Sequence, residues 1–310
     1  MNLHSLIIML AAATAQAAPT ECQEAPCIQV GSYNLELFGG QRSAYDGQER
    51  GPRSDQQLEA IVQRIAVQLD LEVVVFQEID TTSGEWRLFK EKMAAYGYRF
   101  FEGTYSERRQ FVVLAWDADE VRLLEPGRQL SVRDAFDFPK GCVDQGLRRP
   151  IAARFQAGEF DFWVVGVHLK SRRGAPACTS RIRREQCRDL VAAIDALTQG
   201  GERDVLLVGD FNERQHHDSL QPLADAGFTS QMRFLTPTSA QGSYVKNREL
   251  SESTDLIDQV WLRYRETREV VRNSAHVFKL DSKEAAQRYI VEQSDHVPVW
   301  ASFRTDVDHD

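Results

Sequence analysis

The chain has 310 residues, of which 42% are hydrophobic, an ordinary fraction for a soluble globular protein. Its formal net charge of −9 argues against binding of nucleic acid through the overall field of the molecule. No Gly/Ser/Pro-rich linker, internal repeat or low-complexity tract divides the sequence. We therefore expect one large domain over residues 18–310, because sheet-based enzymes of this length often form a single domain.

Residues 1–17 are typical of a secretory signal peptide. Residues 6–13 form a short apolar core, and Ala15-Gln16-Ala17 places small residues at a cleavage site before Ala18. The region ahead of that core has no Lys or Arg, which leaves a buried N-terminal strand or helix as the alternative. No segment is apolar over the length of a transmembrane helix. The sequence therefore predicts a secreted or periplasmic protein.

Five cysteines follow the predicted cleavage site, and export would permit disulfide bonds. Cys22 with Cys27 and Cys178 with Cys187 are the closest pairs in sequence, and Cys142 is the remaining cysteine. Spacing does not settle the connectivity, and the odd count leaves one thiol free or paired with another chain. None has the CxxC spacing of a zinc or redox site, so we expect a structural role.

The first elements in chain order alternate between strand and helix. Residues 28–37 predict a strand, and Ser54 with Gln57 predicts the capping box of a helix. Apolar residues then recur at helical spacing and give that helix one apolar stripe: Leu58, Ile61, Val62, Ile65 and Leu69. The run 73–76 is typical of a strand buried on both faces, and a helix over 86–96 ends before Gly97.

The rest of the chain is richer in strands. A second amphipathic helix is predicted over residues 180–197. Apolar runs predict the remaining strands at 111–116, 121–124, 151–155, 160–168, 204–209, 256–262 and 297–303. Strands outnumber helices, and the helices lie between groups of strands. This pattern is typical of sheets packed together with helices outside.

Polar side chains stand at or near the ends of several apolar runs, where a rigid scaffold can present catalytic groups. One such residue is usually a turn former, but six carboxylates, amides and imidazoles are harder to explain in that way. The six residues are Asn34, Glu78, His168, Asp210, Asn212 and Asp258.

These side chains suggest metal-assisted hydrolysis. Carboxylates such as Glu78, Asp210 and Asp295 are the ligands that hard cations such as Mg²⁺ and Ca²⁺ prefer. His168 and His296 titrate near neutral pH, and each could act as general acid or base if a carboxylate orients its ring. The alternative places both histidines in satisfied core sites and the acids in solvated turns.

Six strings, in order along the chain, resemble the motifs of the endonuclease/exonuclease/phosphatase superfamily. They extend over nearly the whole chain after the leader, from about residue 28 to 304. The strings are SYNLELF (32–38), FQEID (76–80), GVHLKS (166–171), VGDFNE (208–213), LIDQVWL (256–262) and SDHVPVW (294–300). The resemblance implies an α+β fold, the four-layer α/β/β/α sandwich of the deoxyribonuclease I-like type.

Two further strings resemble those of secreted deoxyribonuclease I-like nucleases. TYSERRQFVVL (104–114) is similar to a segment that supplies a Tyr and a Glu in that enzyme, here Tyr105 and Glu107. LRRPIAARF (147–155) is similar to its phosphate-contacting segment, which places Arg148 in that role, with Arg149 as the alternative.

The resemblance also implies a metal site. Glu78 would bind the divalent metal, which we expect to be Mg²⁺, with Mn²⁺ or Ca²⁺ as alternatives. Asn34 and Asp295 would lie beside the metal. Asp210 and Asn212 would hold the scissile phosphate, the attacking water or a second metal.

An acid–base pair is implied in the same way. His168 would be oriented by Glu107, and His296 would be oriented by Asp258. Tyr105 would pack against a sugar or a base of the substrate.

The substrate is less constrained than the reaction. Residues 168–188 hold seven basic side chains against one acid, and we expect Lys170, Arg172 and Arg173 to contact an extended polyanion. A solvated helix face is the alternative. We predict a monomeric nuclease that cleaves DNA. A non-nucleic phosphodiesterase or phosphatase, such as a sphingomyelinase-like enzyme, and an inactive binding module are the other candidates.

Overall fold

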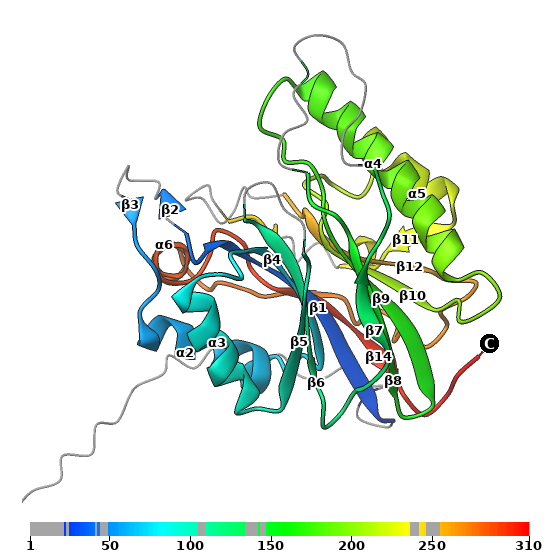
Figure 1. Ribbon diagram of the computed structural model, residues 1–310, viewed down its shortest axis with the longest axis horizontal. Coiled ribbons are helices and arrows are strands. Elements are labelled where there is room, and N and C mark those ends of the chain that lie inside the picture. The colour runs from blue at the N-terminus through cyan, green and yellow to red at the C-terminus, as the bar shows by residue number, and fades with distance from the viewer. Residues whose placement is uncertain are drawn as a thin grey trace, which may run out of the picture.

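The computed structural model shows two six-stranded mixed sheets packed face to face, with helices on both outer sides (Figure 1). This is the α/β/β/α sandwich that the sequence motifs imply. The structure describes residues 22, 25–40, 42–43, 49–104, 109–133, 142, 147–235, 242–245 and 255–309. The predicted signal peptide lies outside the described residues.

The first sheet has the strand order β13-β14-β1-β4-β6-β5. β1 and β4 are parallel, and every other neighbouring pair is antiparallel. Its strands are β1 (Cys27–Phe38), β4 (Val73–Ile79), β5 (Tyr98–Glu102), β6 (Phe111–Asp117), β13 (His276–Val277) and β14 (Val299–Arg304).

The second sheet has the order β11-β12-β10-β9-β8-β7. Only β9 and β10 are parallel, and their register sets His168 beside Asp210, which in turn pairs with Asp258 on β12. Three residues of the predicted site are therefore neighbours across one sheet. The strands are β7 (Arg122–Gln129), β8 (Ile151–Ala157), β9 (Phe160–His168), β10 (Val205–Asp210), β11 (Phe228–Ser230) and β12 (Asp258–Arg263).

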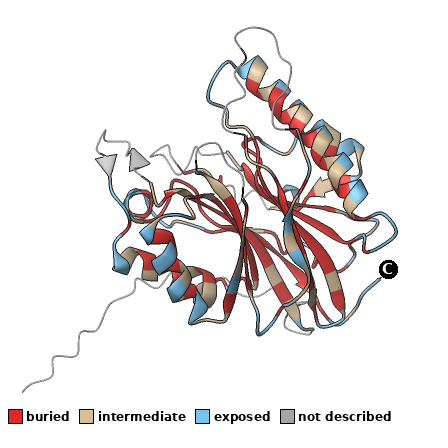
Figure 2. Ribbon diagram, viewed as in Figure 1, coloured by how far each residue is buried: buried red, intermediate tan, exposed pale blue. Residues whose placement is uncertain are grey.

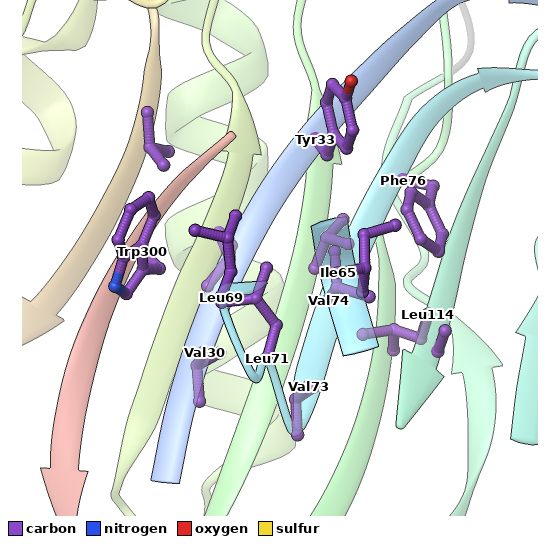
Figure 3. Packing of buried hydrophobic residues seen from close by; sticks show 14 of the residues in the cluster. Val30, Tyr33, Ile65, Leu69, Leu71, Val73, Val74, Phe76, Leu114 and Trp300 are labelled. Atoms are coloured by element: carbon purple, nitrogen blue, oxygen red, sulfur yellow. The ribbon is translucent and has the colours of Figure 1, made fainter. Parts of the chain in front are cut away.

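The central strands are buried on both faces, which explains why their sequences are continuously apolar (Figure 2). In β9, Phe162 and Val164 enter the core between the sheets, whereas Trp163 and Val165 enter a second core under a helix. Figure 3 shows part of the first core, in which Val30 of β1 lies beside Leu71 and Tyr33 lies farther along the same strand.

Helices cover the outer faces of both sheets. Figure 1 shows α2 (Asp55–Gln63) and α3 (Gly84–Ala94) beside the first sheet, and α4 (Pro176–Leu197) and α5 (Gln221–Asp225) beside the second. The predicted capping box is confirmed, since Ser54 and Gln57 exchange both hydrogen bonds at the start of α2. The chain then continues as a π-helix over Arg64–Gln68. The shorter elements are β2 (Arg42–Ser43), β3 (Glu49–Arg50) and the 3-10 turns Asp218–Leu220 and Gln231–Phe234.

Helix α6 (Lys283–Glu292) was not predicted, although its sequence carries the signal. Ser282 caps it through a bond to the backbone N–H of Ala285, and Ala286, Tyr289 and Ile290 are buried on one face at helical spacing. This helix leads directly into the segment that carries Asp295 and His296.

The cysteines form the disulfides Cys22–Cys27 and Cys142–Cys178. The first joins one of the two closest pairs in sequence, but Cys178 does not pair with Cys187. Both residues lie on α4, where nine residues span about 13 Å along the axis, too far for a disulfide. Cys187 is buried and free. Within the described part of the chain, no helix is both long and apolar enough to cross a membrane.

Candidate active site

A polar pocket of about 240 Å³ lies where the two sheets meet. It gathers residues from β1, β4, β9 and β10, from the segments just before β12 and β14, and from several loops. Its walls are Glu36, Leu37, Glu78, Gln110, Arg148, His168, Lys170, Ser171, Arg172, Arg173, Asp210, Asn212, Tyr244, Ile257, Asp295 and His296.

The turn after Asn34 shapes one side of this pocket. The sequence suggested that Asn34 lies at the end of its strand. In the structure β1 continues past Asn34, through an irregularity, to Phe38. Glu36 and Leu37 have positive φ values of 44° and 47°, a conformation that costs non-glycine residues about 1 kcal/mol or more each. The turn directs the N–H of Leu37 to Oε2 of Glu78 at 3.1 Å.

The side chain of Asn34 connects the two sheets. Its Nδ2 atom donates to Oδ2 of Asp210 at 3.1 Å and lies 3.4 Å from Oε1 of Glu78. Its Oδ1 atom accepts from the N–H of Glu36 at 3.0 Å. Asn34 is fully buried, so its amide fixes the separation between the carboxylates of the two sheets.

Asp210 and Asn212 form a tight unit at the end of β10. The N–H of Asn212 donates to Oδ1 of Asp210 at 2.7 Å, and its Nδ2 donates to the carbonyl of Leu169 at 3.1 Å. Gly209 precedes them with a φ of 151°, and a Cβ atom there would lie 2.1 Å from the carbonyl oxygen of Val167. Burial and the charge of Asp258 raise the pKa of Asp210 to about 7.

His168 is buried between carboxylates. Its Nε2 atom lies 3.6 Å from Oδ2 of Asp210 and 3.9 Å from Oε1 of Glu78. Burial, reinforced by the charge of Arg148, lowers the pKa of His168 well below its ordinary value. Among the described residues its Nδ1 atom has no hydrogen-bond partner. Its predicted partner, Glu107, lies outside those residues.

The pKa of His296 is shifted in the opposite direction from that of His168. Burial disfavours its charged form, but the charge of Asp258 and a 2.7 Å bond from Nδ1 to Oδ2 of Asp258 hold its pKa well above the ordinary value. The Oγ atom of Ser243 accepts from the N–H of Asp258 at 2.9 Å and fixes this strand end. Tyr244 packs its ring against the imidazole, with centroids 5.0 Å apart, and Asp295 lies 3.8 Å from Nε2.

The sequence profile of the Endonuclease/Exonuclease/phosphatase family matches residues 31–296, which include every residue of this pocket. The chain belongs to this family. No curated protein sequence matches it closely enough to count as a relative.

Solved structures confirm the family's fold. The catalytic domain of human Nocturnin, with a bound sulfate, has a TM-score of 0.61 at 16% identity and covers 90% of this chain and 94% of its own. TDP2 from D. rerio, complexed with a single-strand DNA product, has a TM-score of 0.60 at 17% identity, and the match covers 90% of this chain and 100% of that one. A mannosyl-6-phosphatase from Bacteroides thetaiotaomicron has a TM-score of 0.58 at 17% identity, and the match covers 88% of this chain and 98% of that one. At these identities the likeness concerns the fold.

The donor atoms fit a hard divalent cation of the kind that endonuclease/exonuclease/phosphatase enzymes use. Oxygen atoms of Glu78, Asp210 and Asp295 line one pocket, as Mg²⁺ prefers. Atoms of Asp210, Asp258 and His296 also lie within 4.8 Å of one another. We do not take these three as the ligands, because Nδ1 of His296 is already bonded to Asp258.

The basic stretch after His168 does not form a uniform rim. Arg172 lines the pocket but is bonded to Glu213 and Asp255 at 3.2 and 3.0 Å. Arg183 is buried. Its Nη2 atom donates to Oε2 of Glu213 at 2.7 Å, and its Nη1 atom donates to the carbonyl of Lys170 at 3.0 Å. Arg183 is one of the seven basic residues counted over 168–188, and its role is structural, so that count overstates the charge available to an extended substrate.

The remaining predicted substrate contacts fall into two groups. Arg148, Lys170 and Arg173 line the pocket, and Arg149 is not among its walls, so the choice between the two arginines favours Arg148. Arg148 donates from Nη2 to Oε1 of Gln110. Tyr105 lies outside the described residues.

The sequence did not single out Gln110, Ile257 or the backbone of Glu36 as pocket residues. Gln110 lies within the string 104–114 that resembles a deoxyribonuclease I-like segment, and this resemblance was the available signal. Ile257 stands directly before Asp258, and this position in the sequence was the only signal for it. Nothing in the sequence indicates the turn at Glu36.

Proposed function

We propose that the chain is a secreted, divalent-metal-dependent phosphodiester hydrolase that cleaves DNA. One arrangement carries the proposal: two buried histidines with oppositely shifted pKa values, His168 and His296, face one oxygen-lined pocket. Environments that drive two titratable groups apart are typical of an acid and base acting on one substrate.

The proposed roles follow from the protonation states. His296 carries the proton, Asp258 orients its ring and stabilises the imidazolium, and His168 stays neutral and able to accept a proton. Asp210 and Asn212 position the attacking water and the phosphate. Glu107 remains the proposed partner of Nδ1 of His168.

Glu78, Asn34 and Asp295 are the proposed metal site. When bound, a divalent metal would neutralise charge on the phosphate and lower the pKa of a coordinated water. Arg148, held by Gln110, provides a fixed positive charge beside the phosphate.

DNA is proposed as the substrate because three basic side chains line the pocket. Lys170, Arg172 and Arg173 place cationic groups beside the catalytic residues in an otherwise acidic protein, as a polyanionic substrate requires. Tyr105 is proposed to pack on a sugar or base. Two disulfides suit an oxidising compartment, which supports secretion or periplasmic residence.

A parallel assay tests the proposal. The mature protein would be incubated with plasmid DNA, RNA, sphingomyelin, a bis-aryl phosphodiester and a sugar 6-phosphate, each with Mg²⁺ and with EDTA. We expect metal-dependent cleavage of plasmid DNA and the bis-aryl diester. Cleavage of sphingomyelin alone, or of the sugar 6-phosphate alone, would overturn the assignment of DNA as the substrate. A protein that turns over none of these substrates would overturn the proposal that the chain is a hydrolase.

A further inference from the structure

Arg53 lies outside the pocket, yet its guanidinium contacts both backbone segments that shape it. The side chain is completely buried at the start of α2, where nothing in the local sequence requires an arginine. Among the described residues its bonds go to three backbone carbonyls and one carboxylate.

The first contact is with the strained turn of β1. Nη2 of Arg53 donates to the carbonyls of Leu35 and, at 3.2 Å, of Glu36. These carbonyls flank the start of the positive-φ pair Glu36-Leu37, which aims one N–H at Asn34 and the other at Glu78. A charged donor at this turn offsets the cost of the left-handed conformation.

The second contact is with the segment that carries Asp295 and His296. Nε of Arg53 donates to the carbonyl of Gln293 at 2.9 Å, and Nη2 donates to the same oxygen. Gln293 is the C-cap of α6, so the guanidinium also lies at the negative end of that helix dipole. Only Ser294 and Asp295 lie between Gln293 and His296.

Ser294 makes a parallel link between the same two segments. Its hydroxyl donates to the carbonyl of Asn34 at 2.6 Å and accepts from the N–H of His296 at 3.0 Å. Arg53 and Ser294 together therefore tie the β1 turn to the segment before β14, one through its guanidinium and one through its hydroxyl.

The guanidinium is itself held in place. Nη1 lies 3.0 Å from Oε1 of Glu85, whose other oxygen accepts from the N–H of Gly39 at 3.0 Å. The ring of Phe38 lies below the guanidinium, 4.7 Å from its carbon to the ring centroid. Lysine would supply one point charge and could not reach all four acceptors, since only arginine has a planar fork of donors.

We propose that Arg53 is a positioning residue that sets the distance between Asn34 and Glu78 on one side and Asp295 and His296 on the other. It acts through backbone carbonyls, that of Glu36 among them, and within the described residues it forms no hydrogen bond with a side chain that lines the pocket. The inference rests on the proposed function, because it concerns the geometry of that same metal and acid–base site.

The test compares Arg53→Lys with a matched control. Arg263→Lys removes an arginine with the same kinds of partner, a carbonyl (Ala226), a carboxylate (Asp195) and a phenyl ring (Phe228), at the end of β12 far from Asp258. For each protein we would measure the melting temperature, kcat and KM on a bis-aryl phosphodiester with Mn²⁺, and Mn²⁺ binding by loss of the free-ion paramagnetic resonance signal.

We expect Arg53→Lys to weaken Mn²⁺ binding and lower kcat by roughly 10- to 100-fold, as loss of a supporting contact around a metal site does. KM should change far less, and Arg263→Lys should change neither binding nor kcat. Equal Mn²⁺ affinity and kcat in Arg53→Lys and the wild type would overturn the inference and leave the proposed function standing. A wild type that neither binds Mn²⁺ nor cleaves the diester would instead overturn the function.

If Arg53→Lys fails to fold, the double variant Arg53→Met/Glu85→Gln replaces it. This pair removes both buried charges, so no carboxylate is left uncompensated, and it keeps an acceptor for Gly39. The same loss of Mn²⁺ affinity is expected, and wild-type affinity in this variant would also overturn the inference.

Discussion

The imidazole of His296 joins the two sheets through the carboxylate of Asp258. Nδ1 of His296, just before β14 of the first sheet, lies 2.7 Å from Oδ2 of Asp258, the first residue of β12 in the second sheet. Both groups are buried, so the bond is protected from water. The bond therefore fixes the charge and the orientation of the ring at once.

Removing the charge of Asp258 should disable His296 while keeping its position. In Asp258→Asn the amide cannot stabilise the imidazolium and favours the wrong tautomer, so kcat should fall by about 10²- to 10⁴-fold. Steady-state cleavage of a bis-aryl diester measures kcat, and circular dichroism checks the fold. A folded variant with kcat within about threefold of the wild type would contradict the assigned role.

Metal binding should stabilise the protein through Glu78. At a Mg²⁺ concentration 100 times Kd, linkage predicts about 2.7 kcal/mol of added stability, visible as a higher melting temperature that EDTA reverses. Glu78→Gln should lose most of this response and most of its activity. Glu91→Gln, on the exposed side of α3, is the control and should respond like the wild type. Equal responses in both variants would place the metal elsewhere.

Gly209 is required by the close approach of β9 and β10. Gly209→Ala would place a methyl group against the carbonyl of Val167 in an unfavourable backbone conformation, at a cost of more than about 2 kcal/mol. Gly201→Ala meets no atom within 4 Å and should change stability by less than about 0.5 kcal/mol. Urea denaturation measures both, and similar midpoints would refute the packing argument.

Arg173 and Arg183 should behave differently despite their proximity in sequence. Arg173→Ser removes an exposed charge at the pocket, so it should lower the salt slope of DNA binding by about one and leave the melting temperature unchanged. Arg183→Ser breaks a buried pair with Glu213 and should cost about 3 kcal/mol of stability. An unchanged salt slope in Arg173→Ser would remove that residue from the substrate surface.

The disulfide pairing predicts how many thiols of the protein will react with a thiol reagent. The folded protein should show no rapidly reacting thiol, because Cys187 is buried, and burial raises the pKa of its thiol to about 12. One thiol per chain should appear in denaturant without reductant. Breaking Cys142–Cys178, which closes a loop of 36 residues, should cost roughly 3–4 kcal/mol. Three reactive thiols in denaturant would show that one disulfide does not form.

Much of the sandwich could be predicted because its central strands are apolar on both faces. The runs 160–168 and 204–209 correspond to β9 and β10 within one residue, and the polar residues that follow them do converge. The strands at the edges of the first sheet were harder to predict. β5 and β13 are short or half-buried, so their composition does not set them apart from loops.

The candidate site was predictable where a side chain carries the chemistry and not where a backbone does. Asp210 and His296 stand in specific strings, but the left-handed turn at Glu36 depends on Arg53, 17 positions later in the chain. The count of basic residues over 168–188 was misleading for a related reason, because it included the buried Arg183. Its partner Glu213 lies 30 positions away, and a local count of charges cannot reveal a buried pair.

The residues that precede β14 leave the ribosome after every other part of the proposed site. Asn34 and Glu78 emerge early, and His168, Asp210 and Asp258 follow, but Asp295 and His296 arrive only after α6 has been made. On the proposed assignment, a nascent chain lacks its proton donor until His296 has been made and β14 inserts beside β1. A fragment that ends before Asp295 would therefore hold most of the site and still lack an essential part of the catalytic machinery.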